Sequence, residues 1–335
     1  MRVSSPGPIP GFIPVADAPS PRACDDRAVI EVRHLTKRYG PTLALDDLSF
    51  TVRPGVVTGF LGPNGAGKTT TMRVALGLAA PATGEVLVGG RQYGRIERPL
   101  FEVGALLDAN GIETGRTAWE HLRWLARSHR IGDARVRLLL EQVGLAGVAR
   151  RRIATYSLGM RQRLGIAAAL LGDPGILVFD EPVNGLDPDG VRWLRELLRS
   201  QADEGRTIFV SSHLMSEMAI TCERLVVIGR GRLLADTTVA ALAERFGAGV
   251  VADSPRAAEL ARGLVAAGAQ VVRESAERLL VTGLDAATVG VVAASASIPL
   301  RGLSARQASL EEAYLQLTAG SAAYRAGPAA GRDDA

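Results

Sequence analysis

The sequence predicts an α/β fold built on a parallel sheet, followed by a smaller α+β domain. Short apolar runs of strand length alternate with helical patterns from Val29 to Ile228. This alternation is typical of a parallel sheet whose helices cover its faces. After about Phe246 the pattern changes to short Val- and Leu-containing runs between Ala-rich helical segments. A length of 335 residues is sufficient for one large and one smaller domain.

The first domain is expected to open with short strands and then to alternate between buried strands and helices. Strand patterns start at Val29 and again near Leu48, and a fully buried strand over 56–61 runs into a glycine-rich turn. The later elements follow the same logic, with helix ends placed at glycines. We expect helices over 68–78, 119–129, 133–143 and 190–203, and strands over 176–179, 207–210 and 225–228.

These patterns predict four parts of the chain. Residues 1–27 contain six prolines and no apolar run after a basic patch, so we expect a disordered leader rather than a signal peptide. Residues 28–246 form the large domain, with a helical insert over about 109–165. Residues 247–318 form the small α+β domain, which ends in a helix over 310–317, and 319–335 form a disordered Ala/Gly-rich tail.

Composition argues against several classes of function. The net charge of +4 arises from 39 basic and 35 acidic residues spread along the chain, which is a poor electrostatic footprint for nucleic acid. No run reaches the roughly 18 consecutive apolar residues of a spanning helix. The two cysteines, Cys24 and Cys222, are too far apart for a metal-ligand motif, which favours reduced thiols over structural zinc.

A phosphate-binding loop is the most specific motif. Residues 62–69 fit the pattern G-x-x-x-x-G-K-[ST] and lie between a predicted strand and a predicted helix, as this loop requires. Its backbone N–H groups and the helix N-terminus would bind phosphate, Lys68 would reach the β- and γ-phosphates, and Thr69 would ligate Mg²⁺. The nucleotide-binding residues predicted here are Gly62, Pro63, Asn64, Gly65, Ala66, Gly67, Lys68, Thr69 and Thr70.

Two carboxylates follow the buried strand at 176–179. Asp180 would stand at the carboxyl edge of the sheet, where ligands bind in open α/β folds, and would hold Mg²⁺. Glu181 could accept a proton from an attacking water. Taken alone, an apolar strand that ends in Asp-Glu is equally consistent with solvated loop carboxylates.

The run Tyr-Ser-Leu-Gly-Met-Arg-Gln at 156–162 completes a set that resembles the ATP-binding cassette (ABC) family. That family's signature is L-S-G-G-Q, so Ser157 and Gly159 match, whereas Leu158 and Met160 depart from it. The resemblance implies that Ser157 and Gly159 approach the γ-phosphate bound by a second subunit. On its own, a serine at a helix start is more often an N-cap.

Three further matches follow in the family's order. Asn-Gly-Leu-Asp at 184–187 resembles the D-loop, which includes Asp187, and Ser-Ser-His at 211–213 resembles the switch that brings His213 to the γ-phosphate. Tyr39 resembles the aromatic residue that stacks on adenine. Without this context His213 would be a structural or surface residue and Tyr39 a core residue. Asp108 stands where the family usually has a glutamine that ligates Mg²⁺.

The resemblance implies a P-loop ATPase that binds ATP and Mg²⁺ and hydrolyses ATP, with Glu181, His213 and Lys68 as catalytic residues. It implies a homodimer that sandwiches ATP and docks on a separate permease at the cytoplasmic face of the membrane. The segment at 309–314 is similar to the drug- and antibiotic-export branch, the daunorubicin-resistance and bacitracin-export type. A soluble ABC ATPase in translation or DNA repair is the alternative, although the tandem cassettes or insertions of such proteins are absent from this sequence.

Overall fold

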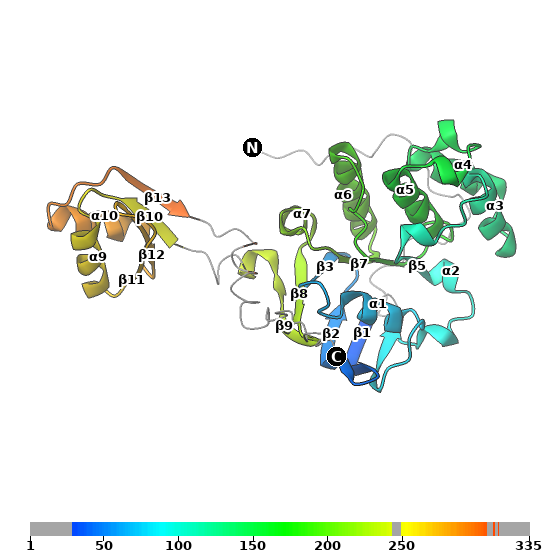
Figure 1. Cartoon of the computed structure of the whole chain (residues 1–335), viewed down its shortest axis with the longest axis horizontal. Helices are drawn as coiled ribbons and strands as arrows, with labels where there is room; N and C mark the ends of the chain where they lie inside the picture. The colour runs from blue at the N-terminus through cyan, green and yellow to red at the C-terminus, as the bar shows by residue number, and fades with distance from the viewer. Residues whose placement is uncertain (1–28, 243–248, 307–310, 312–313, 315–335) are drawn as a thin grey trace, which may run out of the picture. The chain divides into compact units, whose positions relative to one another are not determined.

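The computed structural model describes residues 29–242 and 249–306, together with Glu311 and Tyr314. Internal contacts divide the chain into two compact units, Met1–Asp236 and Thr237–Ala335 (Figure 1). Each unit is described by itself below. The predicted leader at 1–27, the tail at 319–335 and most of the predicted helix at 310–317 lie outside the described residues; Glu311 and Tyr314 are helical.

A six-stranded sheet forms the centre of the first unit, with the strand order β5-β6-β7-β3-β8-β9. The pairs β5–β6, β6–β7, β7–β3 and β3–β8 are parallel, which confirms the predicted α/β fold. Every residue of β3, β6 and β7 is buried, as expected for strands covered on both faces. The strands are β3 (Val57–Leu61), β5 (Val103–Leu106), β6 (Ile176–Phe179), β7 (Thr207–Ser211), β8 (Arg224–Gly229) and β9 (Arg232–Thr238).

The register of this sheet brings the carboxyl ends of four strands to one edge. Leu106 pairs with Phe179, Phe179 with Val210, and Phe60 with Ser211. The loops that follow β5, β6, β7 and β3 therefore begin side by side. These loops carry the aspartates, the histidine and the phosphate-binding loop that the sequence singled out.

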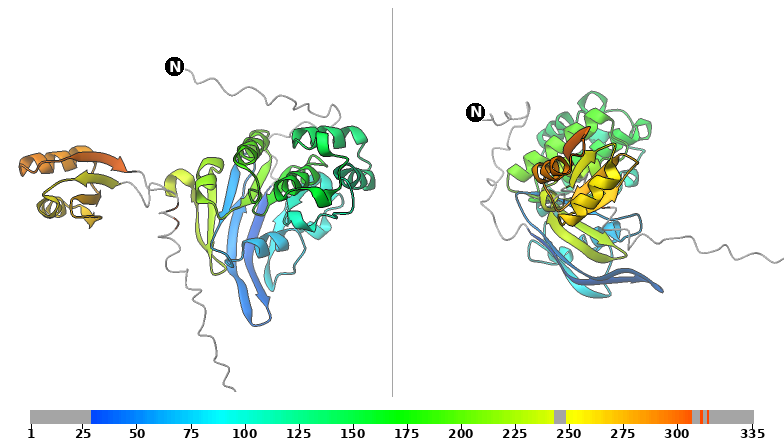
Figure 2. Two further views of the ribbon diagram at one scale, coloured as in Figure 1. Left: turned by 45° about the horizontal axis from the view of Figure 1, so that its top comes forward. Right: turned by 90° about the vertical axis from the view of Figure 1, so that its left-hand side faces the viewer.

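A second sheet of three antiparallel strands, in the order β2-β1-β4, was not predicted as a separate layer. It consists of β1 (Ile30–Tyr39), β2 (Thr42–Val52) and β4 (Thr83–Val88). The strands β1 and β2 extend beyond their apolar runs, and register shifts interrupt the alternation of buried residues along them. Figure 2 shows these strands as a separate layer beside the central sheet.

Helices cover the central sheet and form a cluster at the β5 end of the unit (Figures 1 and 2). That cluster contains α3, which opens with a capping box between Thr117 and Glu120. The helix α1 ends at Ala75, three residues before the predicted end, because the chain turns through Gly77 at φ 69°. The helices are α1 (Lys68–Ala75), α2 (Pro99–Glu102), α3 (Ala118–Ser128), α4 (Asp133–Gln142), α5 (Leu158–Ala169), α6 (Pro188–Asp203) and α7 (Met215–Thr221).

Short 3₁₀ turns complete the connections of the first unit. They are Tyr93–Arg95, Ala109–Gly111, Ala146–Val148 and Ile153–Thr155. In the described part of the chain, every helix falls short of the length and apolarity that a membrane span requires.

The second unit is an α+β domain, as predicted. It follows the order βαββαβ, and its antiparallel sheet has the strand order β11-β12-β10-β13. Val250, Ala252, Leu279 and Val281 alternate along two central strands and share a core with both helices. The elements are β10 (Gly249–Asp253), α9 (Ala257–Ala266), β11 (Gln270–Arg273), β12 (Arg278–Thr282), α10 (Ala286–Ser295) and β13 (Gly302–Arg306).

Three phenylalanine rings join the two sheets of the first unit. Phe50 of β2 lies 5.4 Å from Phe60 of β3, and Phe60 lies 5.0 Å from Phe209 of β7, measured between ring centroids. Phe60 and Phe209 are fully buried. Aromatic rings at this spacing add favourable ring–ring contact to their burial.

We expect Phe60→Ala to lower the free energy of unfolding of the first unit by about 3–5 kcal/mol, because it leaves a cavity between the two sheets. The measurement is urea unfolding followed by tryptophan fluorescence, since all three tryptophans belong to this unit. Leu78→Ala is the control, because Leu78 is 67% exposed and should change the midpoint little. Equal shifts for the two variants would contradict this account of the core.

Candidate functional site

The phosphate-binding loop connects β3 to α1 in a conformation that favours glycine at positions 62, 65 and 67, all of which have positive φ. A Cβ on Gly67, whose φ is 109°, would lie 2.5 Å from the Leu45 side chain. Gly65 has φ 79° and open space around it, so backbone conformation alone favours glycine there. The loop is closed by a hydrogen bond from Ala66 N to Pro63 O. Its backbone therefore has the shape required to bind phosphate oxygens in front of the N-terminus of α1.

Lys68 is held across this loop with only 7% of its surface exposed. Its Nζ donates to Gly62 O at 2.6 Å and lies 4.0 Å from Glu181 Oε1. Burial lowers the pKa of Lys68, and the nearby carboxylates of Glu181 and Asp180 only partly oppose this effect. The charged amine is therefore costly in the protein alone and would be stabilised by a bound phosphate.

Asp180 accepts hydrogen bonds from the first turn of α1 and from the last residue of β7. Thr69 Oγ1 donates to Asp180 Oδ2 at 2.6 Å, and Ser211 Oγ donates to Asp180 Oδ1 at 2.5 Å. The Ser211 hydroxyl also accepts from Glu181 N at 2.9 Å. Asp180 is 8% exposed and Ser211 is fully buried. One carboxylate thus joins the ends of β6 and β7 to the start of α1. Its oxygens and Thr69 Oγ1 are oxygen ligands of the kind that Mg²⁺ prefers.

Glu181 and His213 form the open side of this cluster. His213 Nδ1 lies 2.7 Å from Glu181 Oε2, and His213 N donates to the same oxygen at 3.3 Å. Because a carboxylate only accepts hydrogen bonds, the Nδ1 atom of His213 is assigned as the protonated nitrogen in this contact. Glu181 has φ 50°, a left-handed conformation that costs a non-glycine residue about 1–2 kcal/mol. Strain of this kind is typical of functional sites.

The signature run packs against the segment at 184–187 within the same chain. A Cβ on Gly159 would lie 2.5 Å from Gly185 O, so glycine is required for this close approach. Ser157 is exposed and caps α5, since its Oγ accepts from Met160 N at 3.2 Å. Asp187 caps α6 by accepting from Gly190 N at 2.8 Å. The N-cap interpretation of Ser157 is therefore correct for the single chain.

The predicted site residues thus fall into two groups. Lys68, Thr69, Asp180, Glu181 and His213 form one connected network at the edge of the sheet. Ser157, Gly159 and Asp187 lie at the starts of α5 and α6 and are linked to that network through Gln162, whose Nε2 donates to Glu181 O at 3.3 Å.

Tyr39 and Asp108 stand at or just beyond the ends of β1 and β5. Tyr39 is 48% exposed at the end of β1, with Lys37 Nζ 4.9 Å from the centre of its ring, so it is not a core residue. Asp108 is exposed and lies two residues beyond β5. Because Asp180 N donates to Leu106 O at 2.8 Å, Asp108 belongs to the same edge of the sheet as Asp180.

Two residues of the site were not predicted in their observed roles. Ser211 was noted only as a neighbour of His213, and Gln162 only as part of the signature run. Their signals were a hydroxyl at the end of a buried strand and a buried amide, 4% exposed, in an apolar helix. Buried polar groups generally have partners, which could have drawn attention to both residues.

Comparisons with known proteins agree with this geometry. The sequence profile of the ABC transporter family matches residues 45–184. The bacitracin transport ATP-binding protein BcrA of Enterococcus faecalis is 40% identical over 65% of this chain and 71% of its own length. The lantibiotic transport ATP-binding protein SrtF of Streptococcus pyogenes is 34% identical over 62% of this chain and 89% of its own length. This chain belongs to the ABC transporter ATP-binding family.

The solved structures support the same assignment for the ABC subunit. An ATP-binding subunit of an ABC transporter superimposes with a TM-score of 0.60 at 28% identity, over 65% of this chain and 93% of that one. A separate profile, described as a domain of unknown function (DUF8746), matches residues 248–311. The chain is thus the ATP-binding and ATP-hydrolysing subunit of a transporter, and the non-transport alternative is not favoured.

Lys68→Met should abolish ATP binding by the ABC subunit and yet stabilise the protein without nucleotide, because it removes a buried charge. We expect the melting temperature of the nucleotide-free protein to rise by about 2–4 °C for each 1 kcal/mol gained. Thermal unfolding with and without ATP measures both effects, and Arg192→Met, at an exposed position on α6, is the control. A Lys68→Met protein whose melting temperature still rises with ATP would exclude this lysine from the phosphate site.

Proposed function

We propose that this ABC subunit powers export of an antibiotic-like compound through a separate permease, at the cytoplasmic face of the membrane. The class of cargo is supported by the names of the relatives, bacitracin and lantibiotic transport proteins, and by the resemblance of the segment at 309–314 to the antibiotic-export branch. The observation that carries the energetic role is the network of Lys68, Asp180, Glu181 and His213 at one edge of the sheet.

Each member of the network has a proposed part in hydrolysis. The backbone at 62–67 and Lys68 would bind the β- and γ-phosphates, with Thr70 and the ring of Tyr39 as further nucleotide contacts. Thr69 and Asp180 would hold Mg²⁺, which neutralises charge on the phosphates when bound. Glu181 would accept the proton of the attacking water, and His213, held by Glu181, would contact the γ-phosphate.

A homodimer would complete each site. The exposed side chain of Ser157 and the backbone at Gly159 stand at the N-terminus of α5, where N–H groups attract negative charge. We infer that they contact the γ-phosphate bound by the partner subunit and that Asp187 lies at the dimer interface. Because Gln162 links α5 to the backbone carbonyl of Glu181, closure of the dimer would act on the backbone of the catalytic glutamate.

The chain also contains a second domain in addition to the ATPase domain. We assign residues 28–246 to the ATPase domain, with 109–165 as its helical insert, and 247–318 to an accessory domain. The independent core of the second unit supports a separate interaction or regulatory role for it.

Glu181→Gln should keep ATP binding but lower ATP hydrolysis by about a hundredfold or more, because the amide cannot accept the proton. ATP should then hold two subunits together, which size-exclusion chromatography with light scattering would detect as a dimer in ATP and Mg²⁺. Glu196→Gln, at an exposed position on α6, is the control. If the Glu181→Gln protein binds ATP but stays monomeric, the composite site is wrong.

Asp108 offers a full negative charge where the family usually has a neutral amide. If it faces the metal, Asp108→Asn should weaken Mg²⁺ affinity because it removes the charge. Asp108→Gln should be more active than Asp108→Asn, because the longer side chain brings the amide oxygen nearer to the metal. ATPase activity titrated with Mg²⁺ compares both variants with the wild type, with permease present and absent. Overlaying curves in both conditions would remove Asp108 from the metal site.

A further inference from the structure

The positive charge of the chain is concentrated in the helical part of the first unit rather than evenly spread. Eleven of the 39 basic residues lie between residues 111 and 163, together with only four of the 35 acidic residues. The rest of the chain therefore contains more acidic than basic residues. A local excess of this size produces a positive surface that the net charge of +4 does not reveal.

Two segments of this helical part bring exposed arginines together. The segment before α3 runs antiparallel to the segment before α5, with a bridge between Thr117 and Arg152 and a hydrogen bond from Ile153 N to Arg116 O. Arg116 and Arg152 are therefore neighbours. Arg150 and Arg151 extend the exposed basic surface along the chain.

An exposed tryptophan continues this surface along α3. Trp124 is 57% exposed, and the guanidinium of Arg116 lies 5.0 Å from the centre of its ring. Arg127 is exposed three residues further on and so occupies the same face of the helix. We refer to this surface as the Arg–Trp patch, which consists of Arg116, Trp124, Arg127, Arg150, Arg151 and Arg152.

Glu120, an acidic residue of α3 close to Arg116 and Arg152, offsets part of the positive charge of the patch. The carboxylate of Glu120 accepts hydrogen bonds from Thr117 N and Thr117 Oγ1, both at 2.9 Å, as part of the cap of α3. These bonds, with smaller contributions from Arg116 and Arg152, lower the pKa of Glu120. Two other arginines of this part of the chain form ion pairs: Arg123 pairs with Asp133, and Arg135 pairs with Asp173. Five exposed arginines around the Glu120 carboxylate leave the patch with a net positive charge that faces solvent.

We propose that the Arg–Trp patch binds the anionic headgroups of a lipid bilayer. Basic side chains are attracted to anionic leaflets, and an exposed tryptophan flanked by arginines is typical of a side chain that sits at the membrane–water interface. Single-stranded nucleic acid would call for a series of stacking aromatics along a basic groove, whereas this surface presents one. The biological setting rests on the proposed membrane location, but the binding itself needs no permease.

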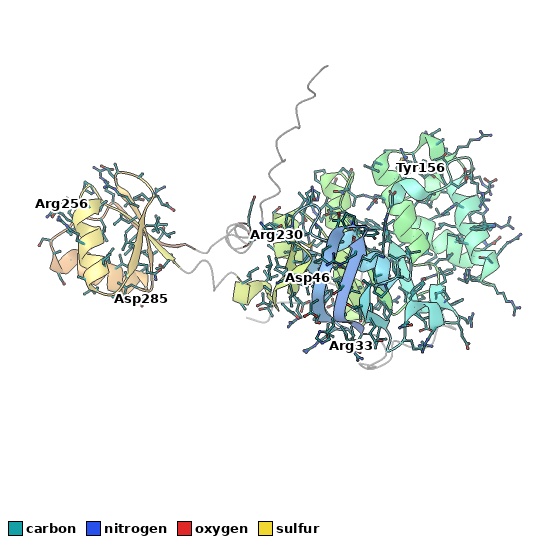
Figure 3. The ribbon with its side chains drawn as sticks, turned by 60° about the horizontal axis from the view of Figure 1, so that its bottom comes forward. Arg33, Asp46, Tyr156, Arg230, Arg256 and Asp285 are labelled. Atoms are coloured by element: carbon teal, nitrogen blue, oxygen red, sulfur yellow. The ribbon has the colours of Figure 1, made fainter. Side chains whose placement is uncertain are left out.

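No residue of the patch takes part in the hydrogen bonds and ion pairs given above for Lys68, Thr69, Asp180, Glu181 and His213. Figure 3 labels Tyr156, which lies in the helical part, at the end of the segment that carries Arg150–Arg152. Tyr156 is buried, and its hydroxyl donates to Val148 O at 2.8 Å, which anchors this segment to the helical part. Substitutions of the exposed arginines should therefore leave the fold and the nucleotide site intact.

The test is sedimentation of the purified full chain with vesicles of phosphatidylcholine alone or with added phosphatidylglycerol. We expect binding only to the anionic vesicles, falling as salt rises. Replacing Arg116, Arg151 and Arg152 together by Gln should weaken it about a hundredfold, from about fivefold for each charge. The matched control replaces Arg53, Arg73 and Arg192 by Gln, which are exposed arginines outside the patch.

A second measurement follows Trp124 itself. Its fluorescence should shift to the blue when anionic vesicles are added, and Trp124→Phe should lose this shift while Trp119 and Trp193 remain. Equal binding to neutral vesicles, equal loss in the two triple variants, or binding to single-stranded DNA but not to vesicles would overturn the proposal. ATPase activity of the same samples without lipid tests the proposed function separately, since the patch variant should keep it.

Discussion

The buried carboxylate of Asp180 is the contact on which the rest of the site depends. It stands at the end of β6, between β5 and β7, and receives hydrogen bonds from Thr69 and Ser211. Through Ser211 the same contact reaches the backbone of Glu181. Because the strands are parallel and in register, their carboxyl ends meet at one edge, and a single carboxylate can connect the ends of β6 and β7 to the start of α1 there. The positions of the lysine, the glutamate and the histidine all follow from that connection.

Several features of the site are energetically unfavourable, and the packing around the site stabilises them. Lys68 carries a charge in a buried place, Glu181 adopts a left-handed backbone, and Gly159 and Gly185 approach too closely for any side chain. These features persist because the strands behind them are fully buried and the phenylalanine cluster holds the two sheets together. Binding of nucleotide and closure of the proposed dimer would relieve part of the free-energy cost of these features. The conformation of the site would therefore depend on whether nucleotide is bound.

The two units of the chain match different kinds of protein families. The ABC relatives align with 62–65% of this chain, whereas the second unit matches a family profile without an assigned function. Its βαββαβ order and separate core explain why it forms a distinct unit. In the first unit, function is carried by the edge of the sheet, and the helical part adds a basic surface of its own.

The sequence by itself determined the family, the alternation of strands and helices, and the identity of the phosphate loop, because these depend on local patterns and on motifs in a set order. Only the tertiary structure decided that β1, β2 and β4 form a separate antiparallel sheet, that Ser211 and Gln162 hold the backbone of Glu181, and that Arg116 and Arg152 are neighbours. Each of these depends on pairings between residues far apart in the chain. Strand register and close backbone approach set such pairings, and neither can be read from local periodicity.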